Sequence, residues 1–172
     1  MNKKIFNIGR LFSILAVMAL TLTACEKDDK SNPTFKATSP SFTLNVPANA
    51  SNNTYDLVSA NGLELTCTQP DYNGVPYVTQ YHVQIALSED FSTFKELETS
   101  YTTAKMSVDA YELNTGVIDL FHEINGDIDY PAEPRPLYIR LRANVVNMAN
   151  TVQDEAFSNI ITLPNVLATF KA

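Results

Sequence analysis

Apolar and polar side chains alternate in the segment QYHVQIAL, residues 80–87. The residues on one side are apolar: Tyr81, Val83, Ile85 and Leu87. Those on the other side are mostly polar: Gln80, His82, Gln84 and Ala86. A period of two residues is typical of a strand that buries one face. This segment therefore predicts a β-strand at the centre of the fold.

A second segment, residues 137–146, has the same period. Its apolar face holds Leu137, Ile139, Leu141, Ala143 and Val145, and its other face holds Tyr138, Arg140 and Arg142. Shorter strands are predicted over residues 42–46, 63–67, 94–99, 104–108 and 156–163, the last ending at Pro164. About seven short alternating strands indicate an all-β sandwich of the immunoglobulin or fibronectin type III kind.

One segment has a helical period instead. Its apolar residues are Leu113, Val117, Leu120, Phe121 and Ile124. Asp109 with Glu112 is the pattern of a helix start, and Gly126 is the pattern of a helix end. A glycine inside a helix costs about 1 kcal/mol relative to alanine. Because of Gly116, a later start at Asn114 or Thr115 is the alternative. We expect one short helix on the rim of the sandwich.

The composition excludes a disordered chain and disfavours a nucleic-acid partner. Of the 172 residues, 45% are hydrophobic and 18% are charged, which provides enough apolar material for a core. Residues 25–172 carry nine Lys and Arg against 19 Asp and Glu. A surface this acidic repels phosphate, so we expect no binding to nucleic acid.

Residues 1–24 have the composition of a lipoprotein signal peptide. Three basic side chains precede an apolar run over residues 11–22, which is shorter than the roughly 20 residues of a membrane-spanning helix. The run ends in LTAC, which resembles the bacterial lipobox, where cleavage precedes a cysteine that then carries lipid. We therefore expect a lipid on Cys25 that anchors the chain in the outer membrane. A plain secretory signal followed by an unrelated cysteine is the alternative.

Acidic residues follow the cysteine directly: Glu26, Asp28 and Asp29. They resemble the surface-export signal of lipoproteins in the Bacteroides group, which predicts display on the cell surface. The alternative is a solvated tether without a signal. The predicted organisation is a signal peptide over residues 1–24, a tether over 25–40, a sandwich domain over 41–165 and a tail or linker over 166–172.

Side chains suited to catalysis or metal binding are few and scattered. Cys67 is in phase with the apolar residues of its strand, so we expect a buried residue rather than a nucleophile. His82 and His122 have no Cys or His beside them at metal-ligand spacing. Asp127 and Asp129 lack the full spacing of a calcium loop, and weak calcium binding there is the alternative. We expect no enzyme activity, no cofactor and no metal.

Tyrosine is the residue best suited to hold a sugar in this chain, which has no Trp. Proteins that bind polysaccharides stack flat aromatic rings on sugar faces. Tyr72, Tyr77 and Tyr130 fall in predicted loops, so a tyrosine platform for a polysaccharide is one hypothesis. The alternative is that these rings fill strand edges and are half-buried.

Several segments resemble the N-terminal domain of the SusE/SusF-like outer-membrane lipoproteins, which belong to glycan-utilisation systems. The segments are PSFTLNVP (40–47), YDL (55–57), LELTCTQPDY (63–72) and YHVQ (81–84). YIRLRAN (138–144) also resembles the penultimate strand of fibronectin type III modules. The resemblance extends over about residues 22–165.

The resemblance implies an immunoglobulin-like spacer. In that family, carbohydrate-binding modules follow this domain and hold a starch-like glycan near the import machinery. Ala172 lies where the first such module would begin, so a truncated paralogue, a fragment and a small accessory lipoprotein all stay open. We expect a non-enzymatic spacer or docking module for partner lipoproteins or a transporter. Direct starch binding through loop tyrosines and an adhesion or pilus-type module are the alternatives.

Overall fold

The structure, a computed structural model, describes residues 41–72, 77–146 and 152–169. These residues contain eight strands and one helix. In chain order they are β1 (Tyr55–Asp56), β2 (Gly62–Thr66), β3 (Thr79–Ala86), β4 (Phe94–Tyr101), β5 (Lys105–Asp109), α2 (Ala110–Asn125), β6 (Arg135–Val146), β7 (Val152–Phe157) and β8 (Ile161–Leu167). The expected all-β fold with one helix is confirmed.

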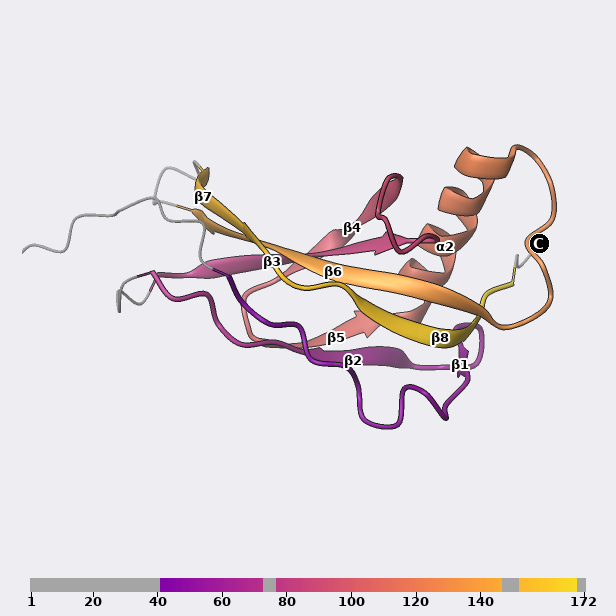
Figure 1. The fold of residues 1–172 in the computed structure, drawn as a ribbon, viewed down its shortest axis with the longest axis horizontal. Coiled ribbons are helices and arrows are strands. Elements are labelled where there is room, and N and C mark those ends of the chain that lie inside the picture. The colour runs from indigo at the N-terminus through magenta and orange to yellow at the C-terminus, as the bar shows by residue number, and fades with distance from the viewer. Residues whose placement is uncertain (1–40, 73–76, 147–151, 170–172) are drawn as a thin grey trace, which may run out of the picture. The chain divides into compact units, whose positions relative to one another are not determined.

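The strands form two sheets that face each other as a sandwich (Figure 1). The larger sheet has the order β1-β8-β6-β3-β4, with β7 also paired to β6, and the smaller sheet consists of β2 and β5. β1 runs parallel to β8, and the other strand pairs are antiparallel. β3 and β6 therefore lie at the centre of the larger sheet, as the two long alternating segments predict.

The inner faces of β3 and β6 confirm the predicted alternation. Tyr81, Val83 and Ile85 are at most 1% exposed, and the five apolar residues of the β6 face are at most 2% exposed. The opposite face of β3 is less open than predicted, because Gln84 and Ala86 are also buried. The side chains of Arg140 from β6 and Glu96 from β4 bond to Gln84, as described below.

The first predicted strand is wrong in part. Phe42 and Leu44 are buried and form isolated bridges to Ser158 and Cys67, but they do not belong to a continuous strand. Val46 is 59% exposed, although the pattern placed it on the buried face. The chain turns at this point, and the amide of Ala50 donates to the carbonyl of Pro47 at 3.1 Å.

The helix begins and ends at the predicted residues. The Asp109 carboxylate accepts a hydrogen bond from the Glu112 amide at 2.9 Å, which caps the first turn. Gly126 has φ 81°, and its amide donates to the carbonyl of His122 at 2.8 Å. The alternative start at Asn114 or Thr115 is wrong, because both lie inside α2. Ile124, predicted to be in the apolar stripe, is 48% exposed.

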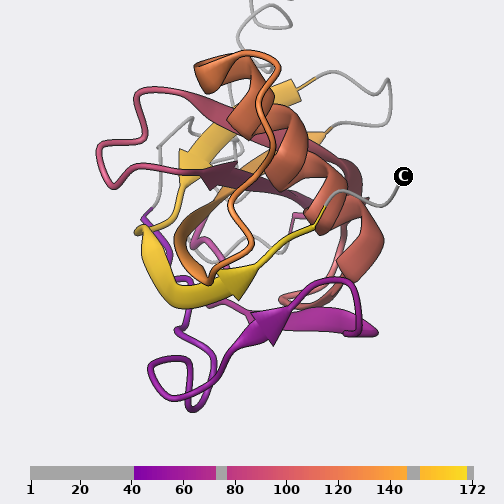
Figure 2. The ribbon, with the colours of Figure 1, turned by 90° about the vertical axis from the view of Figure 1, so that its right-hand side faces the viewer.

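Gly116 lets α2 approach the larger sheet closely. α2 contacts β3 and β4 of the larger sheet and β2 and β5 of the smaller one, and Figure 2 shows it beside the strands of both. A β-carbon at Gly116 would lie 2.9 Å from Cδ2 of Leu97 and 3.2 Å from Cδ1 of Ile85. A glycine that weakens an isolated helix is thus required here by packing.

The last predicted strand is also wrong. In place of one strand over residues 156–163, β7 ends at Phe157 and β8 begins at Ile161. Ser158 causes the break, because its hydroxyl accepts a hydrogen bond from the amide of Leu141 at 2.8 Å. Pro164 does not end β8: it lies where the register against β6 shifts, and an irregular pairing tolerates a missing amide donor.

The domain extends beyond the boundary expected at residue 165. Val166 and Ala168 are both 1% exposed, and Val166 lies in β8. The side-chain amide of Asn114 donates to the carbonyl of Thr169 at 3.0 Å and accepts from its amide at 3.1 Å. The first residues of the expected tail are therefore part of the domain: the core extends to Ala168, and Thr169 is held by Asn114.

Candidate functional site

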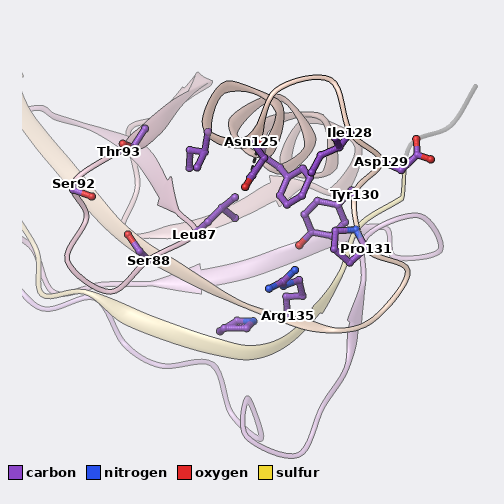
Figure 3. Close-up of a pocket in the computed structure, with 13 residues that line it drawn as sticks. Leu87, Ser88, Ser92, Thr93, Asn125, Ile128, Asp129, Tyr130, Pro131 and Arg135 are labelled. Atoms are coloured by element: carbon purple, nitrogen blue, oxygen red, sulfur yellow. Dashed lines mark hydrogen bonds between the residues drawn. The ribbon is translucent and has the colours of Figure 1, made fainter.

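A pocket of about 560 Å³ lies where the end of α2, the turn after β3 and the loop before β6 come together (Figure 3). The turn contributes Ser88, Ser92 and Thr93, and the loop contributes Asp129 and Tyr130. Cavities of this size hold small organic ligands in other proteins. The pocket is thus a candidate binding site for a small ligand.

The helix end and the loop behind it shape this pocket. After Gly126 ends α2, the amide of Ile128 donates back to the Gly126 carbonyl at 2.9 Å, which turns the chain. The ring of Tyr130 then packs edge-on against Phe121, with centroids 4.9 Å apart and an angle of 70°. Burial raises the pKa of the Tyr130 hydroxyl, and the charge of Arg135 acts in the opposite direction.

The lining of the pocket suits a ligand with many hydroxyl groups. Figure 3 shows the Tyr130 hydroxyl and the Arg135 guanidinium pointing into the same space. Asn125 adds an amide, and Asp129 lies at the edge of the pocket, where Figure 3 shows its carboxylate directed away from Arg135. Aromatic and aliphatic side chains form the remaining wall. This mixture matches a neutral polar molecule better than a strongly charged one.

The three predicted sugar-binding tyrosines do not form one platform. Tyr72 and Tyr77 contact each other edge-on with centroids 5.9 Å apart, and Tyr72 is only 4% exposed. They precede β3, whereas the pocket at Tyr130 includes Leu87 and Ser88, which follow β3. The eight residues of β3 span about 26 Å at roughly 3.3 Å each. Tyr130 is therefore the one that lines the pocket.

A network of ion pairs lies on the outer face of the larger sheet. Arg142 donates to Glu96 at 2.7 and 2.8 Å and to Glu155 at 2.8 Å. The hydrogen bond from Arg142 lowers the pKa of Glu96, against the effect of burial. His82 lies 3.7 Å from Glu96, but burial, with the nearby charge of Arg142, lowers the pKa of His82. His82 is thus neutral at pH 7, and Arg142 is the cation that satisfies both carboxylates.

Arg140, two residues before Arg142, has aromatic neighbours instead. Its guanidinium carbon lies 4.3 Å from the ring centre of Phe91, 5.1 Å from that of Phe94 and 5.0 Å from that of Phe157. Its Nε donates to the side-chain oxygen of Gln84 at 2.7 Å. We call Arg140 and these three phenylalanines the Arg140 cluster. Cations over aromatic faces are held by the ring quadrupole.

Only half of this arrangement could be predicted from sequence. The alternation in residues 137–146 places Arg140 and Arg142 on the outer face of a strand, and the structure confirms that placement. The aromatic partners come from a turn, from β4 and from β7, and nothing in the spacing of those segments connects them. Sequence analysis therefore missed the Arg140 cluster.

Comparison with known protein families assigns the chain to one of them. Residues 28–141 match the family described as SusE outer membrane protein, which is more than half of the chain. The chain belongs to the SusE family. Membership places it at the outer membrane, as expected. No solved structure matches the chain.

The residues predicted to anchor this SusE-family chain lie outside the described residues. They are Cys25, Glu26, Asp28 and Asp29, and their roles stay predictions. Among the residues that the structure describes, no helix has both the length and the apolar character needed to cross a bilayer. In the same ranges, no three His, Cys, Asp or Glu side chains lie close enough together to hold a metal ion.

Cys67 of the SusE-family domain is a buried thiol, as predicted from its phase. It is 9% exposed, and burial raises its pKa to about 11. The thiolate is the reactive form of cysteine, so this environment suppresses its reactivity.

We expect Cys67 to react with a disulfide reagent at pH 8 at least about 100-fold more slowly in the native domain than in urea, because a pKa near 11 leaves little thiolate. The measurement is the rate of dithionitrobenzoate reduction by the mature chain carrying Cys25→Ser. Equal rates in the native and unfolded states would show that the thiol is accessible and unperturbed.

Proposed function

We propose that this chain is a non-enzymatic, lipid-anchored surface module of a glycan-capture system, acting as a spacer or as a docking module for partner lipoproteins or a transporter. The observation that carries the proposal is the SusE-family match, which covers most of the sandwich itself. In the proposed organisation, Cys25 carries the lipid, residues 26–40 form the tether, and residues 41–169 form the sandwich domain.

The hydrogen bonds at the start of the domain support a role as a spacer. The amide of Leu44 donates to the side-chain oxygen of Asn159 at 2.8 Å, and the Asn159 amide donates back to the Leu44 carbonyl at 3.1 Å. A tether that ends at residue 40 therefore joins the fold within a few residues. The described domain thus holds the incoming chain from Leu44 onward, as a spacer requires.

The way in which the chain leaves the domain supports the same role. Asn159 lies just before β8, and Thr169, held by Asn114, lies just beyond its end. The seven residues of β8 span about 23 Å at roughly 3.3 Å each. The chain is thus held near both ends of β8, at Asn159 and at Thr169. These two positions are separated by about the length of one strand, as in a spacer.

A second candidate function is direct glycan binding, and the pocket at Tyr130 is the observation that favours it. Tyr130 contributes an aromatic ring, and Arg135, Asp129 and Asn125 contribute polar groups of the kinds that bind sugar hydroxyls. A single pocket of about 560 Å³ would take a short chain end of a glycan rather than a long segment.

Affinity electrophoresis in soluble starch distinguishes the two functions. For a spacer or docking module, we expect the wild-type chain and a Tyr130→Ala variant to migrate equally, without retardation by the glycan. Tyr111→Ala is the matched control, because Tyr111 is 74% exposed on α2 and does not line this pocket. Retardation of the wild type that Tyr130→Ala abolishes and Tyr111→Ala preserves would establish direct binding in place of the spacer role.

A further inference from the structure

Arg140 lacks an acidic partner in a domain that is rich in acids. Residues 41–169 carry five Lys and Arg against 16 Asp and Glu. Lys95 pairs with Asp119 at 2.8 Å, Lys105 pairs with Glu64 at 3.5 Å, and Arg142 pairs with two glutamates. In the part of the chain that the structure describes, no carboxylate pairs with Arg140. Its cation is therefore available to an anion from outside.

The surroundings of Arg140 hold the guanidinium in place and leave it partly exposed. Its Nε is bound to Gln84, whose amide donates to Glu96 at 2.8 Å, so the side chain is fixed through a hydrogen-bonded chain. Phe94 is 43% exposed and Phe157 is 45% exposed, on two different strands. A fixed arginine fork beside exposed flat rings suits a ligand that has a carboxylate next to a flat, CH-rich face.

We propose that the Arg140 cluster binds an acidic sugar residue, a hexuronate, with its carboxylate on the guanidinium of Arg140 and its ring against Phe94 or Phe157. Arginine binds a carboxylate through two parallel hydrogen bonds, which fixes the orientation of the bound group. The sugar ring presents C–H groups to the aromatic rings, as in other stacked sugar sites.

The size of the cluster favours a sugar over a protein partner. A phenylalanine has on the order of 200 Å² of accessible surface, so two rings that are less than half exposed offer on the order of 200 Å² together. A stable protein interface takes about 800 Å² from each partner. The exposed rings match the face of one or two sugar units, and they cover only a fraction of a protein interface.

This site is separate from the pocket at Tyr130 and does not depend on the proposed spacer role. The Arg140 cluster shares no residue with the lining of that pocket. The ligand classes also differ, because the lining of the pocket includes the acidic residue Asp129 as well as Arg135, whereas the Arg140 cluster contains no acid. A module that only spaces its partners can thus still carry this site on its sheet.

The test is an NMR titration of the full lipidated chain in detergent micelles with trigalacturonate. We expect the backbone signals of Phe94, Arg140 and Phe157 to shift together. The fully methyl-esterified trisaccharide has the same rings without the charge, and we expect it to cause no such shifts. Affinity is expected to fall about tenfold or more in Arg140→Gln, because the charge-assisted bonds are lost.

The matched control is Lys105→Gln, which removes one positive charge from an exposed side chain that lies outside both the Arg140 cluster and the pocket at Tyr130 and is expected to bind trigalacturonate as the wild type does. If Arg140→Gln does not fold, Phe94→Ala takes its place with an expected loss of about threefold or more. The proposal is overturned by an absence of shifts in the wild type, by equal shifts with the methyl ester, by shifts that map elsewhere, or by full affinity in the folded Arg140→Gln variant.

Discussion

A Cys25→Ala variant is expected to carry no lipid and to be missing from the outer-membrane fraction in which the wild-type chain is recovered. Each buried methylene of an acyl chain contributes about 0.8 kcal/mol to membrane binding, so a chain of about 16 carbons contributes on the order of 10 kcal/mol. Alanine has no thiol to accept a lipid, and the whole contribution is lost. The measurement is membrane fractionation combined with mass spectrometry of residue 25.

Two other variants serve as controls for the anchor. Cys67→Ala removes the remaining cysteine, which is buried in the sandwich, and should leave the chain in the membrane. Replacing Glu26, Asp28 and Asp29 by alanine changes the tether charge but keeps the lipidated residue, so membrane recovery should also persist. Recovery of Cys25→Ala at the wild-type level in the outer membrane would refute lipid anchoring at this residue.

A Gly116→Val variant is expected to lose about 1 to 3 kcal/mol of unfolding free energy, which is the usual cost of forcing extra atoms into a packed core. The first added carbon already lies 2.9 Å from Leu97 and 3.2 Å from Ile85, and both of those side chains are buried. The better helix propensity of valine offsets only a few tenths of a kcal/mol. Urea unfolding at fixed pH measures the difference.

Thr115→Val is the matched control for the helix. Thr115 is exposed on α2 directly before Gly116, so the same new side chain meets solvent there. Its effect should stay within about 0.5 kcal/mol. If Gly116→Val were as stable as the control, α2 would not be held close to β3 and β4 as the structure shows.

The core of this fold could be predicted from sequence because its strands repeat one simple pattern. Alternation in β3 and β6 identifies the buried face directly, and the helical stripe in α2 has a different period that cannot be mistaken for it. The capping residues Asp109 and Gly126 mark the ends of α2 through local bonds. Each of these signals is contained within one segment.

The errors arise where a distant residue competes with the local pattern. Ser158 and Asn159 bond to Leu141 and Leu44, and these contacts break a segment that reads as one strand. Pro164 reads as a strand end, but the shifted register against β6 accommodates it. Neither effect is visible without knowing which strands are neighbours.

The same limit applies to the candidate sites. Tyr72 and Tyr130 both fall in loops, and only the path of β3 shows that they lie at different ends of a strand. The Arg140 cluster depends on the register that places Arg140 opposite Gln84, next to the strand that carries Phe94. A shift of one residue in that register would turn Arg140 toward the core.

Two asparagines that hold the ends of the domain also determine how it carries mechanical load. Asn159 is hydrogen-bonded to Leu44 near the start of the domain, and Asn114 is hydrogen-bonded to Thr169 near its end. Tension between those points runs along β8 itself, so the load passes through the backbone of this strand and through the Asn159 bonds to Leu44, and not across the hydrogen bonds between β8 and β6. A pull applied at these two points therefore loads the contacts of Asn159 before it loads the larger sheet.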